Sequence, residues 1–248
     1  MIKKGDWLLL NADIKFEHTS KQFYGKYCFK LVVFAPGGRS IYNNKRTIEQ
    51  SIHIRQQVAK NYNPGGSWGV SRWSQEGFGR YVNLADVNLL AFFKQKKSQL
   101  KDTIKFRVDE PFITLYASTE QELLDFAREL PGENSDKIEL ISAPTSDQAK
   151  ALLESGAIIT NNPREYAFKV TLRDGRYTTE TKTTLLNYLL SLGTDVELPK
   201  ASKTHLSRLN WMYNVYFYCN DDRIVTMLNL MAPNIVRAVN SLVHKNPS

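Results

Sequence analysis

The chain has 248 residues, 42% of them apolar, which is enough to form one large domain or two smaller ones. It contains no run of eighteen apolar residues that would predict a membrane-spanning helix. Its first residues, MIKKGDWLLLNADIKF, lack the long apolar core and small-residue cleavage site of a secretory signal. We therefore expect a cytoplasmic protein with no membrane partner.

The net charge of +8 comes mainly from the N-terminal part of the chain. Residues 1–108 hold 19 basic and 7 acidic residues, residues 109–163 hold 3 and 11, and residues 164–248 hold 11 and 7. A local surplus of positive charge attracts polyanions. We therefore expect nucleic acid as the partner, with an incidental basic surface as the alternative.

Strand and helix patterns follow one another in a regular order along the first half. Alternating apolar residues predict a strand in YCFKLVVFAPGGR (27–39), with Tyr27, Phe29, Leu31 and Val33 on one face, and a helical pattern follows over 46–61. TIKFRVDEPFITLYAS (103–118) predicts two strands around a turn at 109–111. Ser118 is the expected N-cap of the helix TEQELLDFAREL, and KIELISAP predicts a last strand.

The second half repeats this order after a short connector helix, SDQAKALLESG, which we expect Ser146 to cap and Gly156 to end. A strand is predicted in YAFKVTLRDGR, whose alternating residues are Tyr166, Phe168, Val170 and Leu172. The helix TTETKTTLLNYLLSLG follows and has Gly193 at its end. DVELP and WMYNVYFYC predict two strands, DDRIVTMLNLM a helix capped by Asn220, and NIVRAVNSLVH a final strand.

Both halves therefore begin with Tyr-x-Phe-Lys and share the order β-α-β-β-α-β, which predicts an α+β fold of two tandem ferredoxin-like halves. Each half would have a four-stranded antiparallel sheet with both helices on one face. The predicted domains are half one (1–144), a connector (145–163) and half two (164–248), with an insertion at 62–103. Chance similarity of short patterns is the alternative.

The insertion contains PGGSWGVSRWSQEGFGRY (64–81), which places aromatic and arginine side chains on a glycine-rich backbone. Aromatic rings stack on nucleobases, and basic side chains pair with phosphates, so the segment and its basic flanks predict a clamp on a single strand. Packing into the protein's own core and a protein–protein contact are the alternatives. The candidate nucleic-acid-binding residues are Arg39, Lys45, Arg46, Arg55, Lys60, Trp68, Arg72, Trp73, Phe78, Arg80, Tyr81, Lys94, Lys96 and Lys97.

The sheet faces are a second candidate, because nucleic-acid-binding proteins of this fold stack bases on aromatics of the two central strands. The residues in question are Tyr27, Phe29 and Tyr116 in half one, and Tyr166, Phe168, Tyr216 and Tyr218 in half two. The same alternation fits residues that face the helices, and we favour a core role for them.

Cysteine and histidine usage indicates neither a metal nor a cofactor. Cys28 and Cys219 lie far apart in strand-like runs, which is typical of buried free thiols in a reducing compartment, with a disulfide as the alternative. No histidine stands at a metal-ligand spacing from another histidine, a cysteine or a carboxylate. The pair Asp221–Asp222 is typical of paired polymerase aspartates, but its position at a helix start favours capping.

The predicted order is similar to that of CRISPR-associated endonucleases that cut precursor RNA, several of which have a histidine in or near the first helix. That resemblance would make His53 a general base, with Lys45 or Arg46 stabilising the developing charge. Those enzymes carry a glycine-rich loop before their last strand, where this chain has MAPNIV. A helix-face histidine with no special role is the favoured interpretation of His53.

The sequence therefore predicts a non-catalytic protein that binds single-stranded RNA or DNA with low sequence specificity, in a viral or mobile-element context. A structural or virion-type assembly subunit, which would self-associate through the inserted loop, is the first alternative. A metal-independent RNA endonuclease is the second.

Overall fold

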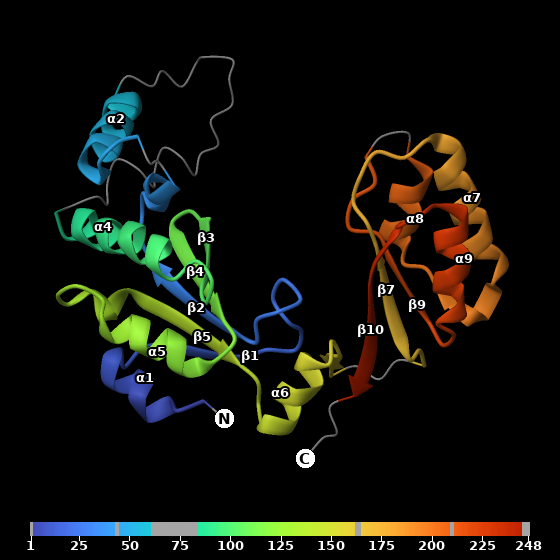
Figure 1. Cartoon of the computed structure of the whole chain (residues 1–248), viewed down its shortest axis with the longest axis horizontal. Coiled ribbons are helices and arrows are strands. Elements are labelled where there is room, and N and C mark those ends of the chain that lie inside the picture. Colours follow the sequence, from blue (N-terminus) through green and yellow to red (C-terminus); the bar gives the residue numbers. More distant parts are fainter. Residues whose placement is uncertain (1, 43–44, 61–83, 162–164, 209–210, 245–248) are drawn as a thin grey trace. The chain divides into compact units, whose positions relative to one another are not determined.

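The protein is described here from a computed structural model, which covers residues 2–42, 45–60, 84–161, 165–208 and 211–244 (Figure 1). It is a mixed α+β chain in which the described residues form two five-stranded sheets and eight α-helices. The chain divides into two compact units, Met1–Lys150 and Ala151–Ser248.

Unit 1 is built on a sheet of strand order β1-β5-β2-β4-β3, in which β1 is parallel to β5 and the other neighbours are antiparallel. The helices α4 and α5 lie on one face of this sheet, and α1 lies beside α5 (Figure 1). The elements are α1 (Lys4–Leu10), β1 (Lys15–His18), β2 (Phe29–Phe34), the 3₁₀ helix η1 (Gly38–Tyr42), α2 (Ile48–Lys60), α4 (Leu84–Gln99), β3 (Lys105–Asp109), β4 (Phe112–Ala117), α5 (Glu120–Arg128), the 3₁₀ helix η2 (Asn134–Lys137) and β5 (Ile138–Ala143).

The core of unit 1 lies between this sheet and its helices. Leu31 and Val33 of β2 pair with Leu115 and Ile113 of β4, and all four side chains are fully buried. A cluster of rings continues this core, since Phe93 of α4, Phe106 of β3 and Phe126 of α5 lie with centroids 5.5 to 6.5 Å apart. Such tilted and edge-on pairs add to the stabilisation from apolar burial.

Unit 2 has the strand order β6-β10-β7-β9-β8, with β6 parallel to β10 and the other neighbours antiparallel. The helices α7 and α9 lie on one face of this sheet (Figure 1). The elements are β6 (Ile158–Thr160), β7 (Phe168–Leu172), α7 (Thr179–Ser191), the 3₁₀ helix η3 (Gly193–Asp195), β8 (Val196–Glu197), α8 (Lys200–Ser207), β9 (Tyr216–Cys219), α9 (Arg223–Met231) and β10 (Val236–His244).

The core of unit 2 forms where β7 and β9 face α7 and α9. Val170 pairs with Phe217 across these strands, and both are buried with Leu185 of α7 and Leu228 of α9. The helix α6 (Asp147–Glu154) spans the boundary between the units, and the Ser146 hydroxyl accepts a hydrogen bond from the Ala149 amide as expected for its cap.

The predicted four-stranded antiparallel sheets are five-stranded and mixed. The additional strands β1 and β6 are short, each joins the sheet edge parallel to the last strand of its unit, and β6 lies inside the predicted connector. Short edge strands carry weak patterns, so nothing in KFEH or IIT distinguished them from loops. The helices α1 and α8 were also not predicted.

Two predicted helix caps were wrong. The N-cap of α5 is Thr119 rather than Ser118, because the Thr119 hydroxyl accepts from the Glu122 amide while the Glu122 carboxylate accepts from the Thr119 amide. The N-cap of α9 is Asp222, and the Asn220 side chain instead accepts a hydrogen bond from the Ala167 amide at the start of β7. Both cysteines are buried free thiols, as expected, and burial raises the pKa of Cys219 to about 11.

The capping box of α5 gives a direct test of these assignments. Thr119→Ala removes the hydroxyl that accepts from the Glu122 amide, and we expect it to lower the free energy of unfolding by about 1 kcal/mol. Ser118→Ala is the matched control and should cost less than about 0.5 kcal/mol. Urea unfolding of both variants measures the difference, and equal losses would contradict the assignment of Thr119 as the cap.

Candidate nucleic-acid interface

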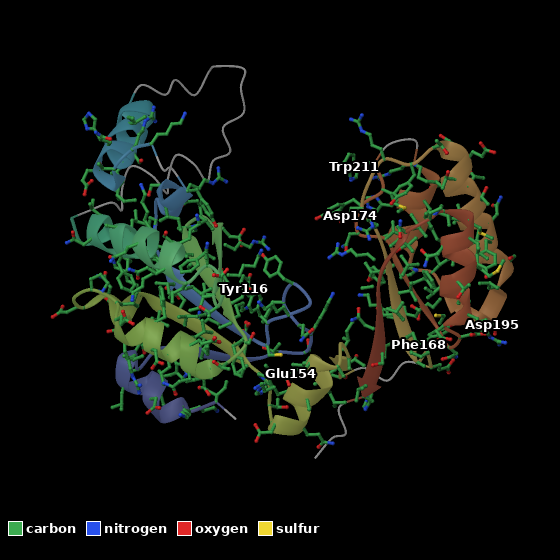
Figure 2. The ribbon with its side chains drawn as sticks, viewed as in Figure 1. Tyr116, Glu154, Phe168, Asp174, Asp195 and Trp211 are labelled. Atoms are coloured by element: carbon green, nitrogen blue, oxygen red, sulfur yellow. The ribbon has the colours of Figure 1, made fainter. Side chains whose placement is uncertain are left out.

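The face of the first sheet opposite α4 and α5 carries polar and aromatic side chains on its central strands. Because side chains alternate along a strand, the burial of Leu31 and Leu115 toward the helices directs Lys30 and Tyr116 to the opposite face. Lys30 pairs with Tyr116 across β2 and β4, and Lys105 of β3 pairs with Tyr116 from the other side. Figure 2 shows Tyr116 on this side of the sheet.

A tight turn between β1 and β2 places a second tyrosine over this face. The backbones of Phe23 and Tyr27 bond to each other, and the Lys26 amide donates to the Phe23 carbonyl at 3.1 Å. The two central residues, Tyr24 and Gly25, have φ values of 56° and 65°, as in the type I′ turns of hairpins. Glycine adopts this conformation freely, whereas a tyrosine in it costs about 1–2 kcal/mol. Tyr24 therefore occupies a turn position at which glycine or asparagine would cost less.

Tyr24 is the centre of a network of rings and cations. Its ring lies 5.0 Å from that of Tyr116 in an edge-on arrangement, and the Lys105 ammonium lies 4.3 Å from its centroid. Hydrogen bonding to Tyr24 and to Asp109 raises the pKa of Arg107, so the guanidinium stays charged. Tyr24 keeps 52% of its surface exposed, so part of the side chain is open to a ligand.

The cations of this face outnumber its carboxylates. The strands direct four basic side chains and two acidic ones to it, namely Lys15, Lys30, Lys105, Arg107, Glu17 and Asp109. Lys30 donates to the Glu17 carboxylate at 3.1 Å, and the Arg107 Nε lies 2.7 Å from the Asp109 carboxylate. The turn adds the exposed Lys21 and Lys26. The face therefore has a net positive charge around two tyrosines.

The basic and aromatic surface continues around the edge strand β3. The Tyr42 hydroxyl of η1 donates to the Phe106 carbonyl of β3 at 3.1 Å, and the Lys97 ammonium of α4 lies 4.2 Å from the Tyr42 ring centroid. Burial raises the pKa of Tyr42, and interactions with Tyr24 and Asp109 raise it further. The Tyr42–Lys97 pair is thus within electrostatic range of the Tyr24 network.

The sequence-predicted candidates divide into three groups. Trp68, Arg72, Trp73, Phe78, Arg80 and Tyr81 lie outside the described residues, and Arg55 and Lys60 belong to the part of α2 described by its backbone alone. Lys94 and Lys96 have partners within unit 1, because the Lys94 ammonium donates to the Arg46 carbonyl at 2.8 Å and Lys96 pairs with Glu129. The third group lies at or near η1, which contacts β3. Arg39 is in η1, Lys97 lies over the ring of Tyr42 in η1, and Lys45 and Arg46 follow η1 in the chain.

The sheet-face candidates also separate. Tyr27 and Phe29 are buried, as the favoured core interpretation predicted. Tyr116 is buried too, but on the helix-free face, where the rings of Phe23 and Tyr24 pack against it. In unit 2, Phe168 packs against the core. Tyr216 and Tyr218 lie on the opposite face, where Tyr216 is partly exposed and Tyr218 is buried. Sequence reasoning missed Tyr24, Lys105 and Arg107. The alternation of basic and apolar residues in KFRV was the signal that would have found the two cations.

The residues considered for catalysis or metal binding are Asp221, Asp222 and His53. Asp221 accepts from the Arg223 amide and pairs with its guanidinium, and these bonds lower the pKa of Asp221. Among the described residues, no group of three or more histidine, cysteine, aspartate or glutamate side chains is arranged to hold a metal. His53 is exposed on α2. Its role as a general base in RNA cleavage stays a prediction. No helix in the described ranges is both long and apolar enough to cross a membrane.

Comparison with known proteins gives no relative for this chain. No family model matches it, no curated protein matches it, and no solved structure matches it.

The buried tyrosine of the network gives a prediction about pH. Burial raises the pKa of Tyr116 to about 12, against about 10 in the unfolded chain. Between pH 10 and 12 the unfolded state therefore loses this proton while the folded state keeps it, so stability falls as the pH rises. Tyr116→Phe should make this fall shallower in urea unfolding at pH 9 to 12. An unchanged slope would place the Tyr116 hydroxyl in water.

Proposed function

We propose that the protein binds single-stranded nucleic acid, without catalysis and with little sequence preference, through the helix-free face of the first sheet. The observation that carries the proposal is Tyr24, a half-exposed ring held in a costly backbone conformation between Lys105 and Arg107. Stacking on a base and pairing with phosphates require this combination of groups.

The arrangement supports a specific mode of binding. A base stacks on the exposed surface of Tyr24, while Lys105 and Arg107 neutralise the phosphates on either side of it. Stacking needs an unpaired base, which favours single strands over duplexes. Rings and cations contact features that every nucleotide has, so the affinity depends little on sequence.

We also propose an origin for the fold of the two units. The orders β5-β2-β4-β3 and β10-β7-β9-β8 are those expected of two β-α-β-β-α-β cores, each with a parallel strand added at one edge. We propose that the chain is a tandem duplication of one ferredoxin-like unit extended by a preceding helix and strand. The common Tyr-x-Phe-Lys start of β2 and β7 supports this origin.

The decisive experiment is a salt-dependent titration of labelled single-stranded DNA and RNA with three forms of the full chain. Tyr24→Asn keeps a residue that tolerates positive φ and removes the ring, so affinity should fall by about 1–3 kcal/mol. Lys105→Gln with Arg107→Gln should weaken binding and reduce the slope of log affinity against log salt by about 2.

Two further variants make this test selective. Asp109→Asn removes the carboxylate beside Arg107, so it should raise the affinity for both nucleic acids. Lys200→Gln with Lys203→Gln, at exposed positions of α8 in unit 2, removes the same two positive charges as Lys105→Gln with Arg107→Gln and should have little effect. If affinity is indifferent to salt, or if this unit 2 variant loses as much affinity as the Lys105 and Arg107 variant, the proposed interface is wrong.

A role as an assembly subunit is the second candidate, and the helix α9 favours it. Leu230, Met227 and Met231 expose 72%, 43% and 36% of their surfaces there. Clustered apolar side chains of this kind mark protein contacts. In light scattering, self-association through α9 predicts an oligomer that Leu230→Glu dissociates and that nucleic acid does not change. A monomer at all concentrations would exclude this candidate.

A further inference from the structure

The helix-free face of the second sheet repeats the central pair of the first. Lys169 of β7 pairs with Tyr218 of β9, as Lys30 of β2 pairs with Tyr116 of β4. The Lys169 ammonium lies 3.9 Å from the ring centroid of the neighbouring Tyr216 and 5.8 Å from that of Tyr218. The two rings meet edge-on, with centroids 5.7 Å apart.

Two more aromatic side chains extend this face at the start of the β9 segment. Met212 is fully buried and exchanges both backbone hydrogen bonds with Gly175, so its neighbours Trp211 and Tyr213 project away from the core. Trp211 exposes 53% of its surface and Tyr213 exposes 61%. Figure 2 shows Trp211 on the side of unit 2 away from α7 and α9.

Backbone and charged groups hold these rings in place. The Asn214 amide donates to the Asp174 carboxylate at 2.6 Å, and Asn214 has a φ of 52°, which turns the chain between Tyr213 and the buried Val215. The Arg176 guanidinium carbon lies 5.8 Å from the centre of the Trp211 ring. A large indole therefore stays exposed with an arginine beside it, as at stacking sites for nucleobases.

The helix-free faces of the two sheets differ in charge at the residue that pairs with the central tyrosine from the edge strand. The residue that pairs with the central tyrosine from the edge strand is Lys105 in unit 1 and Glu197 in unit 2. Arg237 of this unit pairs with Asp174 at 3.4 Å. The second face thus offers more exposed aromatic surface and less net charge than the first.

We infer that this second face is a separate stacking site for bases of a single-stranded nucleic acid, centred on Trp211 and Tyr213. Arg176 lies beside Trp211, and Lys169 lies beside Tyr216 on the same face, where they accommodate phosphates. The inference rests on the proposed function, and it adds that one chain holds a strand at two places. The first face supplies most of the salt-dependent attraction, and the second supplies stacking.

The test uses the full chain and single-stranded oligonucleotides of 8 and 40 nucleotides, measured by anisotropy at several salt concentrations. Trp211→Ala with Tyr213→Ala should weaken binding of the 40-mer about tenfold or more, because each lost base stack has a large effect on affinity. The slope of log affinity against log salt should stay unchanged. Since both rings are exposed, the variant should fold, and circular dichroism checks this.

The outcomes separate this inference from the proposed function. If the Tyr24→Asn variant loses affinity while Trp211→Ala with Tyr213→Ala binds the 40-mer normally, the second site is refuted and the first stands. If neither variant loses affinity, both proposals fail. If the unit 2 variant changes only the oligomeric state in light scattering, the face is a protein contact, and the inference is overturned. Arg176→Gln, which keeps both rings, should give a smaller loss in the same direction.

Discussion

The register of β2 against β4 and β5 is the constraint on which the arrangement of unit 1 depends. Leu31 and Val33 have to meet Leu115 and Ile113 beneath the helices, and a shift by one residue would bury Lys30 and expose Leu31. The same register places Lys30 and Tyr116 side by side on the opposite face. The hydrophobic core and the candidate interface are therefore two consequences of one pairing.

In unit 1, the acidic residues of α5 lie on the helix-covered side of the sheet, and the basic residues Lys105 and Arg107 lie on the other side. The acidic residues of α5 and its C-cap are engaged within the helix layer, where Glu120 accepts from the Trp7 indole and the Lys3 amide, and Glu129 pairs with Lys96. These contacts tie α1 and α4 to α5. The Glu129–Lys96 pair neutralises a cation among the helices, while Lys105 and Arg107 lie on the opposite face of the sheet.

The turn at Tyr24 places a residue of strained backbone conformation over this charged face. Glycine or asparagine adopts the backbone conformation of both central positions at the lowest cost. This turn instead has Tyr24 at the first of them, which lowers the stability of the fold. Strain of this kind is concentrated at functional positions. In unit 2 the exposed rings are instead supplied by the segment before β9, with Asn214 in the left-handed conformation. The two units thus present aromatic side chains on equivalent faces by different local means.

Much of the fold could be predicted because period-two and helical patterns are local. They gave the strands β2 to β5 and β7 to β10 and the helices α2, α5, α6, α7 and α9 near their observed positions. The short strands β1 and β6 could not be predicted, because three or four residues at a sheet edge take their conformation from the partner strand. The cap of α5 was misplaced by one residue, since Ser118 and Thr119 have the same capping chemistry.

For the interface, the sequence by itself determined that the chain is basic at its N-terminal end, that it has two similar α+β halves, and that apolar residues alternate along their strands. Only the tertiary structure decided which side of each sheet the helices cover, and so brought Tyr24, Tyr116, Lys105 and Arg107 together from three separate segments. The physical reason is that a side chain's neighbours across a sheet are set by strand register and layer packing. For β2 against β4, and for Tyr24 against Tyr116, these contacts join residues about 80 to 90 positions apart in the chain.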